Sequence, residues 1–70
     1  MDTMSIMKIF ILLSPSREKI IFLSFVEALT SLAIGQEMEE WTEHEDHRNM
    51  ILMRRYRKDT DGSVIVIPLR

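Results

Sequence analysis

The residues best suited to chemistry lie in one short segment, E-H-E-D-H, at positions 43–47. If this segment is helical, His44 and His47 lie three positions apart, and each follows a glutamate by about one turn. Two imidazoles and a carboxylate suit zinc or a similar divalent ion. However, the chain has no H-E-x-x-H motif and no distant ligand that would complete the set. We therefore predict no metal site and no cofactor, and interpret the segment as a solvated helix end.

Sequence signatures of catalysis are missing from the chain. It contains no cysteine, and no serine lies in a G-x-S-x-G nucleophile motif. Only 2 glycines are present, too few for a loop that cradles phosphate. Carboxylates are frequent at positions 37–46, but few apolar neighbours shield them, so little would tune them for acid–base catalysis. We predict that the protein is not an enzyme.

Charge is distributed in two blocks of opposite sign. Six acidic residues and no Lys or Arg lie between Gln36 and His47, whereas five basic residues and no acid lie between Arg48 and Lys58. Such asymmetry indicates either internal pairing or two oppositely charged surfaces.

The acidic block also contains Trp41, the only tryptophan of the chain. Tryptophan often anchors protein interfaces, and charged side chains steer association and reject wrong partners. The alternative is that Trp41 belongs to the core and that the acids pair with the bases. We predict a binding surface for a protein partner, of unknown identity, made of Glu37, Glu39, Glu40, Trp41 and Glu43.

The basic block contains R-R-Y-R-K, the strongest nucleic-acid signal in the chain. Arginines beside a tyrosine suit single-stranded nucleic acid, and a β-ribbon fits a major groove. The net charge of −2 opposes approach to phosphates. Nucleic-acid binding is therefore the alternative function, and it would use Arg54, Arg55, Tyr56, Arg57 and Lys58.

The first half of the chain predicts a strand followed by the main helix. Residues 6–13 are almost entirely apolar and too short for a helix before Pro15, so they predict a strand buried on both faces. Residues 15–34 predict a helix, with Ser14 as its N-cap and Gly35 at its end. Apolar residues recur there at three- and four-residue steps and form its predicted buried face: Ile21, Phe22, Phe25, Val26, Leu29, Leu32 and Ala33.

The second half predicts a short helix and a C-terminal hairpin. Residues 36–47 favour a helix, because as a strand they would expose a row of glutamates that pair badly with one another. Residues 49–58 and 63–69 predict two strands around the turn D-T-D-G. Pro68 cannot donate to a ladder, so the last strand belongs at a sheet edge. A four-residue loop predicts three facing pairs: Lys58 with Ser63, Tyr56 with Ile65, and Arg54 with Ile67.

Together these elements predict a single small α+β domain over residues 1–70, in the order β-α-(α)-β-β. One main helix would pack on a three-stranded sheet that includes the C-terminal hairpin. The other apolar sheet face would then be uncovered, and a second copy is its simplest cover. A chain of 70 residues without disulfides also has little core to stabilise it alone. We predict a homodimer.

The function predicted from these features is binding. We expect a small non-enzymatic interaction or inhibitor protein that binds a protein partner as a homodimer. The longest apolar run, residues 20–34, contains Glu27 and is shorter than the ~20 residues that span a bilayer. We therefore expect no membrane role and a cytoplasmic location.

Overall fold

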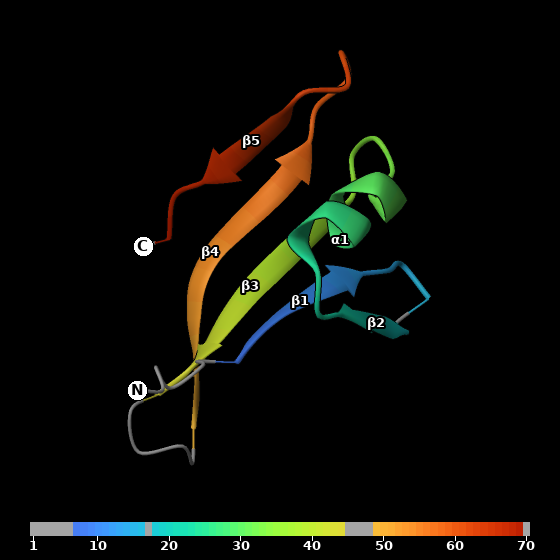
Figure 1. Ribbon diagram of the computed structural model, residues 1–70. Coiled ribbons are helices and arrows are strands. Elements are labelled where there is room, and N and C mark those ends of the chain that lie inside the picture. The colour runs from blue at the N-terminus through green and yellow to red at the C-terminus, as the bar shows by residue number, and fades with distance from the viewer. Residues whose placement is uncertain (1–6, 17, 45–48, 70) are drawn as a thin grey trace.

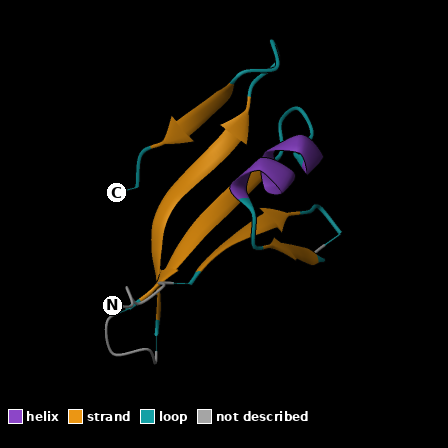
Figure 2. Ribbon diagram, viewed as in Figure 1, coloured by secondary structure: helices purple, strands orange, loops and turns teal. Residues whose placement is uncertain are grey.

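The computed structural model describes residues 7–16, 18–44 and 49–69 (Figure 1). The described chain forms one antiparallel sheet in the order β2-β1-β3-β4-β5, with a single helix against one of its faces (Figure 2). The elements in chain order are β1 Lys8–Leu13, β2 Lys19–Phe22, α1 Phe25–Ser31, β3 Glu37–Glu43, β4 Met50–Lys58 and β5 Val64–Ile67.

The predicted three-stranded sheet with one main helix is wrong. The sheet has five strands, and the region predicted as the main helix divides into a turn, the edge strand β2 and the short helix α1. β2 has the β-branched and aromatic sequence K-I-I-F, and it pairs antiparallel with β1. The helix N-cap is Ser24, whose hydroxyl accepts from the Glu27 amide at 3.3 Å. Ser14, the predicted cap, instead accepts from the Ser16 amide at 3.2 Å.

The predicted second helix is also wrong, since residues 37–43 form β3. A helix was predicted because a strand would expose a row of glutamates. The strand is compatible with these glutamates because β3 lies beside β4, whose arginines stand opposite them in the ladder. The partner strand therefore decides the conformation of residues 37–43.

The C-terminal hairpin is present, but its predicted register is wrong by one residue. Lys58 faces Val64, and Tyr56 faces Val66. The loop has five residues, 59–63, one more than predicted, because the first ladder pair is Lys58 with Val64. Within this loop, the Asp59 amide donates a hydrogen bond to the Ser63 carbonyl at 2.7 Å. Gly62 supplies the positive φ of 89°. The slip turns every β5 side chain to the opposite face from the one predicted. As predicted, Pro68 follows a strand at the sheet edge.

The core lies between α1 and one face of the sheet, called here the helix face. α1 begins at Phe25 and is shorter than the predicted helix. Its Ala28 is buried, whereas Phe25 and Val26 are 39% and 70% exposed. The helical face predicted from the spacing was therefore wrong in part. The buried apolar residues are Phe10, Leu12, Ala28, Leu32, Met38 and Tyr56.

The opposite face of the sheet, called here the open face, has no described element over it (Figures 1 and 2). β1 is therefore buried on one face only: Phe10 and Leu12 are buried, whereas its open-face side chains are half-buried. A β-bulge at Glu40/Trp41 leaves Met53 unpaired and sets Leu52 opposite Trp41 on the open face. The apolar residues of the open face are Ile9, Ile11, Leu13, Ile21, Trp41, Met50, Leu52, Ile65 and Ile67.

Candidate functional site

The two charge blocks meet on neighbouring strands. In the β3–β4 ladder, Glu37 stands opposite Arg57, Glu39 opposite Arg55, and Glu40 opposite Arg54. Three of the predicted protein-binding residues thus stand opposite three of the predicted nucleic-acid-binding residues, rather than on a separate surface. Since side chains alternate between faces along a strand, these pairs are shared between the open face and the helix face.

On the open face, Glu39 forms a compact polar unit with two neighbours. Its carboxylate accepts from Arg55 Nη2 at 2.7 Å and from Trp41 Nε1 at 3.1 Å. The Glu39 side chain is only 15% exposed, although no described element covers it. Charge-assisted hydrogen bonds of this length are among the stronger ones in proteins. The open face therefore has a preorganised polar centre within an apolar surround.

On the helix face, Glu40 is buried at 4% exposure. Its Oε1 accepts from the Tyr56 hydroxyl at 2.6 Å, and Arg54 Nη1 lies 3.4 Å from Oε1 and 3.3 Å from Oε2. Lys8 Nζ lies 3.8 Å from Oε2. A buried carboxylate destabilises a fold unless it is paired and hydrogen-bonded, and here both oxygens have partners.

The environment of Tyr56 shifts its acidity. Burial raises the pKa of the phenol above its ordinary value of 10.0, and the hydrogen bond to Glu40 and the negative charge of that carboxylate raise it further. Arg54 acts in the opposite direction. The phenol therefore stays protonated and acts as a donor to Glu40.

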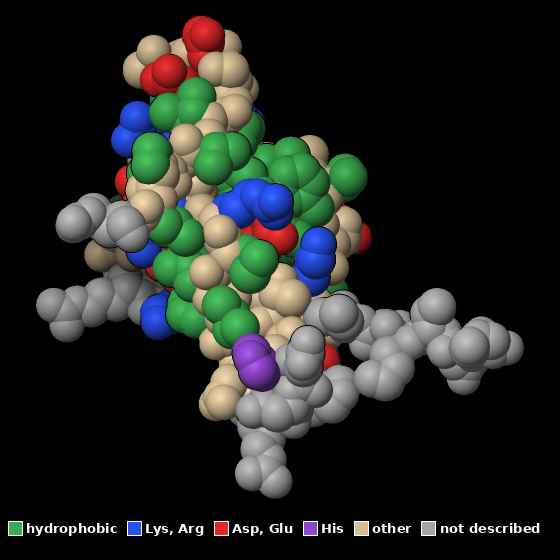
Figure 3. Space-filling model, turned by 90° about the vertical axis from the view of Figure 1, so that its left-hand side faces the viewer, with side chains coloured by type: hydrophobic (Ala, Val, Ile, Leu, Met, Phe, Trp, Pro, Cys, Tyr) green, Lys and Arg blue, Asp and Glu red, His purple; other side chains and the backbone are tan. Residues whose placement is uncertain are grey.

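A cleft of about 370 Å³, called here the Glu40 cleft, lies over this network. Figure 3 shows basic side chains around an acidic one near the middle of the view, bordered by hydrophobic side chains. The cleft combines charged, aromatic and aliphatic side chains, which include Lys8, Leu23, Phe25, Glu40, Arg54 and Tyr56.

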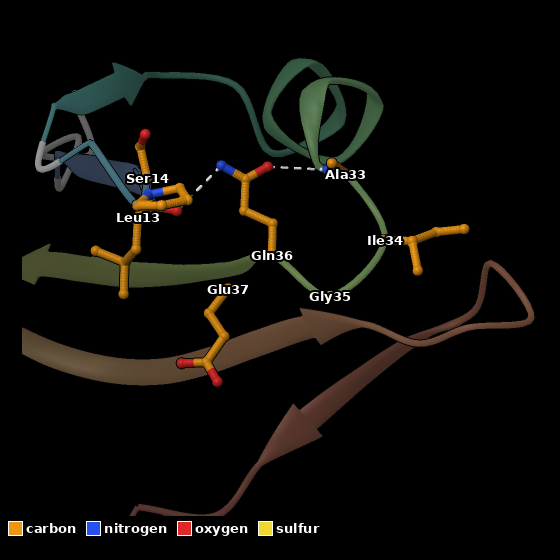
Figure 4. A pocket seen from close by; sticks show the side chains of 8 residues that line it. Leu13, Ser14, Ala33, Ile34, Gly35, Gln36 and Glu37 are labelled. Atoms are coloured by element: carbon orange, nitrogen blue, oxygen red, sulfur yellow. Dashed lines mark hydrogen bonds between the residues drawn. The ribbon is translucent and has the colours of Figure 1, made fainter.

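A second hollow, of about 590 Å³, lies between the end of β1 and the loop that precedes β3 (Figure 4). The Gln36 amide crosses it, donating to the Leu13 carbonyl at 3.1 Å and accepting from the Ala33 amide at 2.9 Å. Its main polar side chain is thus used to hold the loop against β1. We assign this hollow a structural role.

Alternation distributes the predicted site residues between the two faces. Four of the predicted partner-binding residues lie on the open face with Arg55 and Arg57, while Glu40 lies apart on the helix face. Tyr56 is 8% exposed under the Phe25 ring, at a centroid distance of 5.5 Å. Lys58 Nζ donates to the Leu32 carbonyl at 3.1 Å.

Sequence reasoning missed Lys8 and the aliphatic residues of the open face, although it included Trp41 and expected one apolar sheet face to be uncovered. The signal for Lys8 was its position as the only charged residue in the first apolar strand. The open-face residues could not be identified because their face depends on a register and a bulge that the sequence did not predict.

Metal and membrane features are limited in the described part of the chain. No group of three or more His, Cys, Asp or Glu side chains there is placed to hold a metal ion. His44 is exposed, and His47 lies outside the described residues. Within the same residues, no helix has the length and apolar character needed to cross a bilayer.

No protein-family model, curated protein or solved structure matches the chain. Its two surfaces, the open face and the Glu40 cleft, are therefore the basis for assigning a function.

Proposed function

We propose that this chain is a small non-enzymatic binding protein of the cytoplasm that acts as a homodimer, with a second copy covering the open face. The observation that supports this most is the self-complementary arrangement of charge on an apolar sheet face. The absence of cysteine from the sequence is compatible with a reducing compartment.

The apolar part of the open face supplies the driving force. Aliphatic side chains from the other four strands share this face with Trp41 of β3, and Ile21 at one edge is 57% exposed. Large apolar areas left open on a protein surface mark interaction sites. Two sheets that pack face to face align their strands within about 30° and bury both inner faces.

The charged part of the open face favours a second copy as the occupant. Acids lie on β3 and bases on the adjacent β4, at the same levels along the strands. A twofold axis parallel to the strands, placed between β3 and β4, sets β3 of one copy over β4 of the other. Glu39 of each copy then faces Arg55 of the other. An isologous interface requires this kind of self-complementarity.

The nucleic-acid alternative gains less support from the geometry. Each arginine of residues 54, 55 and 57 stands opposite a glutamate, which weakens attraction to phosphates. The Tyr56 ring is buried and its hydroxyl is bound to Glu40, so the ring is not free to stack on a base.

The dimer is tested by charge reversal. Light scattering at micromolar concentration should report twice the monomer mass for the natural chain and the monomer mass for Glu39→Arg and for Arg55→Glu, since each single variant places like charges over one another. Mixing the two variants should restore the dimer mass, because the introduced arginine of one chain then faces the introduced glutamate of the other. A monomeric natural chain, or a mixture that stays monomeric, would overturn the proposal.

Neighbouring residues of β5 provide a matched control for the apolar contact. Ile65 lies on the open face and Val66 on the helix face, where it is 58% exposed. Ile65→Lys should give a folded monomer by circular dichroism and light scattering, whereas Val66→Lys should remain a dimer. Equal masses for these two variants would show that the open face is not the interface, even if the charge variants fail to fold.

A further inference from the structure

The Glu40 cleft lies on the face opposite the proposed dimer interface and contains charge that the fold does not use. One buried carboxylate faces two cations, Lys8 and Arg54, whose side chains are 54% and 52% exposed. The carboxylate neutralises only one of them. The cleft therefore carries a surplus of one positive charge at its mouth.

Hydrogen-bond donors remain available on both cations. Arg54 contacts Glu40 through Nη1 alone, so that carboxylate does not use the Nε and Nη2 donors. Lys8 meets Glu40 at Oε2, at 3.8 Å, although an ammonium group has three donors. By contrast, both oxygens of Glu40 already accept hydrogen bonds or ion pairs. The cleft thus offers unused donors to an anion, whereas its only carboxylate already has partners on both oxygens.

The rest of the cleft is apolar. Leu23 is 73% exposed, and the half-covered Phe25 ring packs on Phe10 at 5.4 Å and on Tyr56 at 5.5 Å. These contacts fix the aromatic wall in place, while Leu23 extends beside it. The volume of about 370 Å³ lies at the lower end of the range for small-ligand sites, roughly 300–1,000 Å³.

We infer that the Glu40 cleft binds a carboxylate carried on an aromatic or branched aliphatic group. The carboxylate would pair with the remaining donors of Arg54 and Lys8, and the apolar group would lie against Phe25 and Leu23. A single negative charge matches the surplus of one positive charge. A dianion such as a phosphate monoester would place its second charge near Glu40 without a cation to balance it.

The test compares ligands that differ only in charge. The probes are 3-phenylpropionate, its neutral amide and phenyl phosphate, titrated into the isotopically labelled chain and followed by amide NMR shifts. We expect saturable shifts at the cleft residues with 3-phenylpropionate, and about tenfold weaker binding of the amide, since a charge-assisted hydrogen bond is lost. Equal binding of the amide, tighter binding of phenyl phosphate, or shifts confined to the open face would each overturn the inference.

Three variants test where the charged and apolar parts of the ligand lie. Lys8→Gln should weaken binding of 3-phenylpropionate severalfold, whereas Lys19→Gln, which removes an exposed cation on the edge strand β2, should leave it unchanged. Leu23→Ser should weaken the acid and the amide equally, because it removes apolar contact and no charge. Unaltered binding in both Lys8→Gln and Leu23→Ser would overturn the inference.

Peptide probes distinguish the two sources of such a carboxylate. One probe is an acetylated tetrapeptide that ends in phenylalanine with a free carboxyl group. If this peptide binds more tightly than 3-phenylpropionate, the ligand is the C-terminus of a partner chain. If the peptide binds more weakly than 3-phenylpropionate, the ligand is a free organic acid. Because the cleft and the open face are on opposite sides of the sheet, the monomeric variant Ile65→Lys should still bind the probe, so failure of the dimer and failure of the cleft are distinguishable.

Discussion

At the scale of single residues, Glu40 is the least expected feature of the chain. Its neighbours on the helix face, Phe10 and Met38, are apolar and buried, yet a carboxylate occupies the position beside them. Replacing a buried ion pair with apolar groups is often neutral for stability, whereas removing one partner is not. Glu40 therefore fixes the positions of its donors more than it adds to the stability of the fold.

The first prediction concerns removal of that carboxylate. Glu40→Ala leaves the Tyr56 hydroxyl and the Arg54 guanidinium without their acceptor, and it should lower the free energy of unfolding by about 2–3 kcal/mol. The control is Glu37→Ala, a half-buried position at the end of β3, which should cost less than about 1 kcal/mol. Chemical denaturation measures both. Equal losses of unfolding free energy in the two variants would mean that the hydrogen bonds of Glu40 add no more stability than an ordinary surface ion pair.

The second prediction uses Tyr56, the only tyrosine of the chain. Its phenol should titrate above 10.0 in the folded protein and near that value in urea, as followed by the ultraviolet absorbance of the phenolate. Because the unfolded chain loses this proton first, the folded state should keep its full stability below the ordinary pKa and lose stability as the pH rises above it.

Glu40→Gln should lower the pKa of Tyr56 in the folded state, since it removes the neighbouring negative charge. An unchanged pKa in that variant would contradict the assigned cause.

At the scale of elements, the helix is short and depends on its cap. α1 has 7 residues, fewer than an isolated helix needs, so packing and capping must hold it. Packing comes from Ala28 and Leu32, and the cap comes from Ser24.

The third prediction tests the cap. Ser24→Ala removes the acceptor for the Glu27 amide and should cost about 1 kcal/mol of unfolding free energy. Ser31→Ala, at the exposed last residue of the helix, should be neutral or slightly stabilising because alanine is the better helix former. If the two serine variants unfold at the same denaturant concentration, Ser24 is not the cap.

The fourth prediction tests the hairpin loop. Gly62 has a φ of 89°, where a side chain is strained even though nothing lies within 4 Å of an added Cβ. Gly62→Ala should therefore cost about 1 kcal/mol, and Gly62→Asn should cost less, because asparagine tolerates positive φ. Thermal melts compare the two with Thr60→Ala, an exposed loop control. An alanine variant as stable as the natural chain would contradict the strained backbone.

The sequence predicted the elements whose signals are local. The turn residues Asp59 to Gly62 indicated the hairpin, and the apolar run before Pro15 indicated β1. β3 was missed because its glutamates become compatible with a strand only beside the arginines of β4, which is a tertiary effect. β2 was missed because its apolar residues also fit a helical period, and pairing with β1 decided the outcome.

The candidate site was predicted in composition but not in arrangement. The sequence indicated Glu40, Arg54 and Tyr56 as functional residues, but for two different functions. Their convergence depends on the β3–β4 register and on the bulge beside Glu40, neither of which leaves a local sequence signal.

At the scale of the whole molecule, the two faces of the sheet differ in composition and covering. The helix face holds the core and the Glu40 cleft, whereas the open face holds an apolar surface around Glu39, Trp41 and Arg55. A second copy on the open face would leave the cleft of each copy facing outward.

The fifth prediction uses Trp41, the only tryptophan, as a reporter of the open face. Iodide quenching of its fluorescence should increase when the protein is diluted, because dissociation exposes the indole. The monomeric variant Ile65→Lys should show strong quenching at every concentration. Quenching that does not depend on dilution in the natural chain would contradict a dimer formed through Trp41.

The strand order also determines how quickly the chain can reach its native state. Three of the four strand pairings join consecutive strands, β1–β2, β3–β4 and β4–β5, and hairpins of this kind form within about 1–10 μs. The β1–β3 pairing alone must wait for the ends of a long intervening segment to meet, so it should limit the folding rate. Until it forms, the isoleucine-rich β1 has an unpaired edge and can add to another chain. Refolding yield should therefore fall as protein concentration rises, even though the finished sheet conceals that edge.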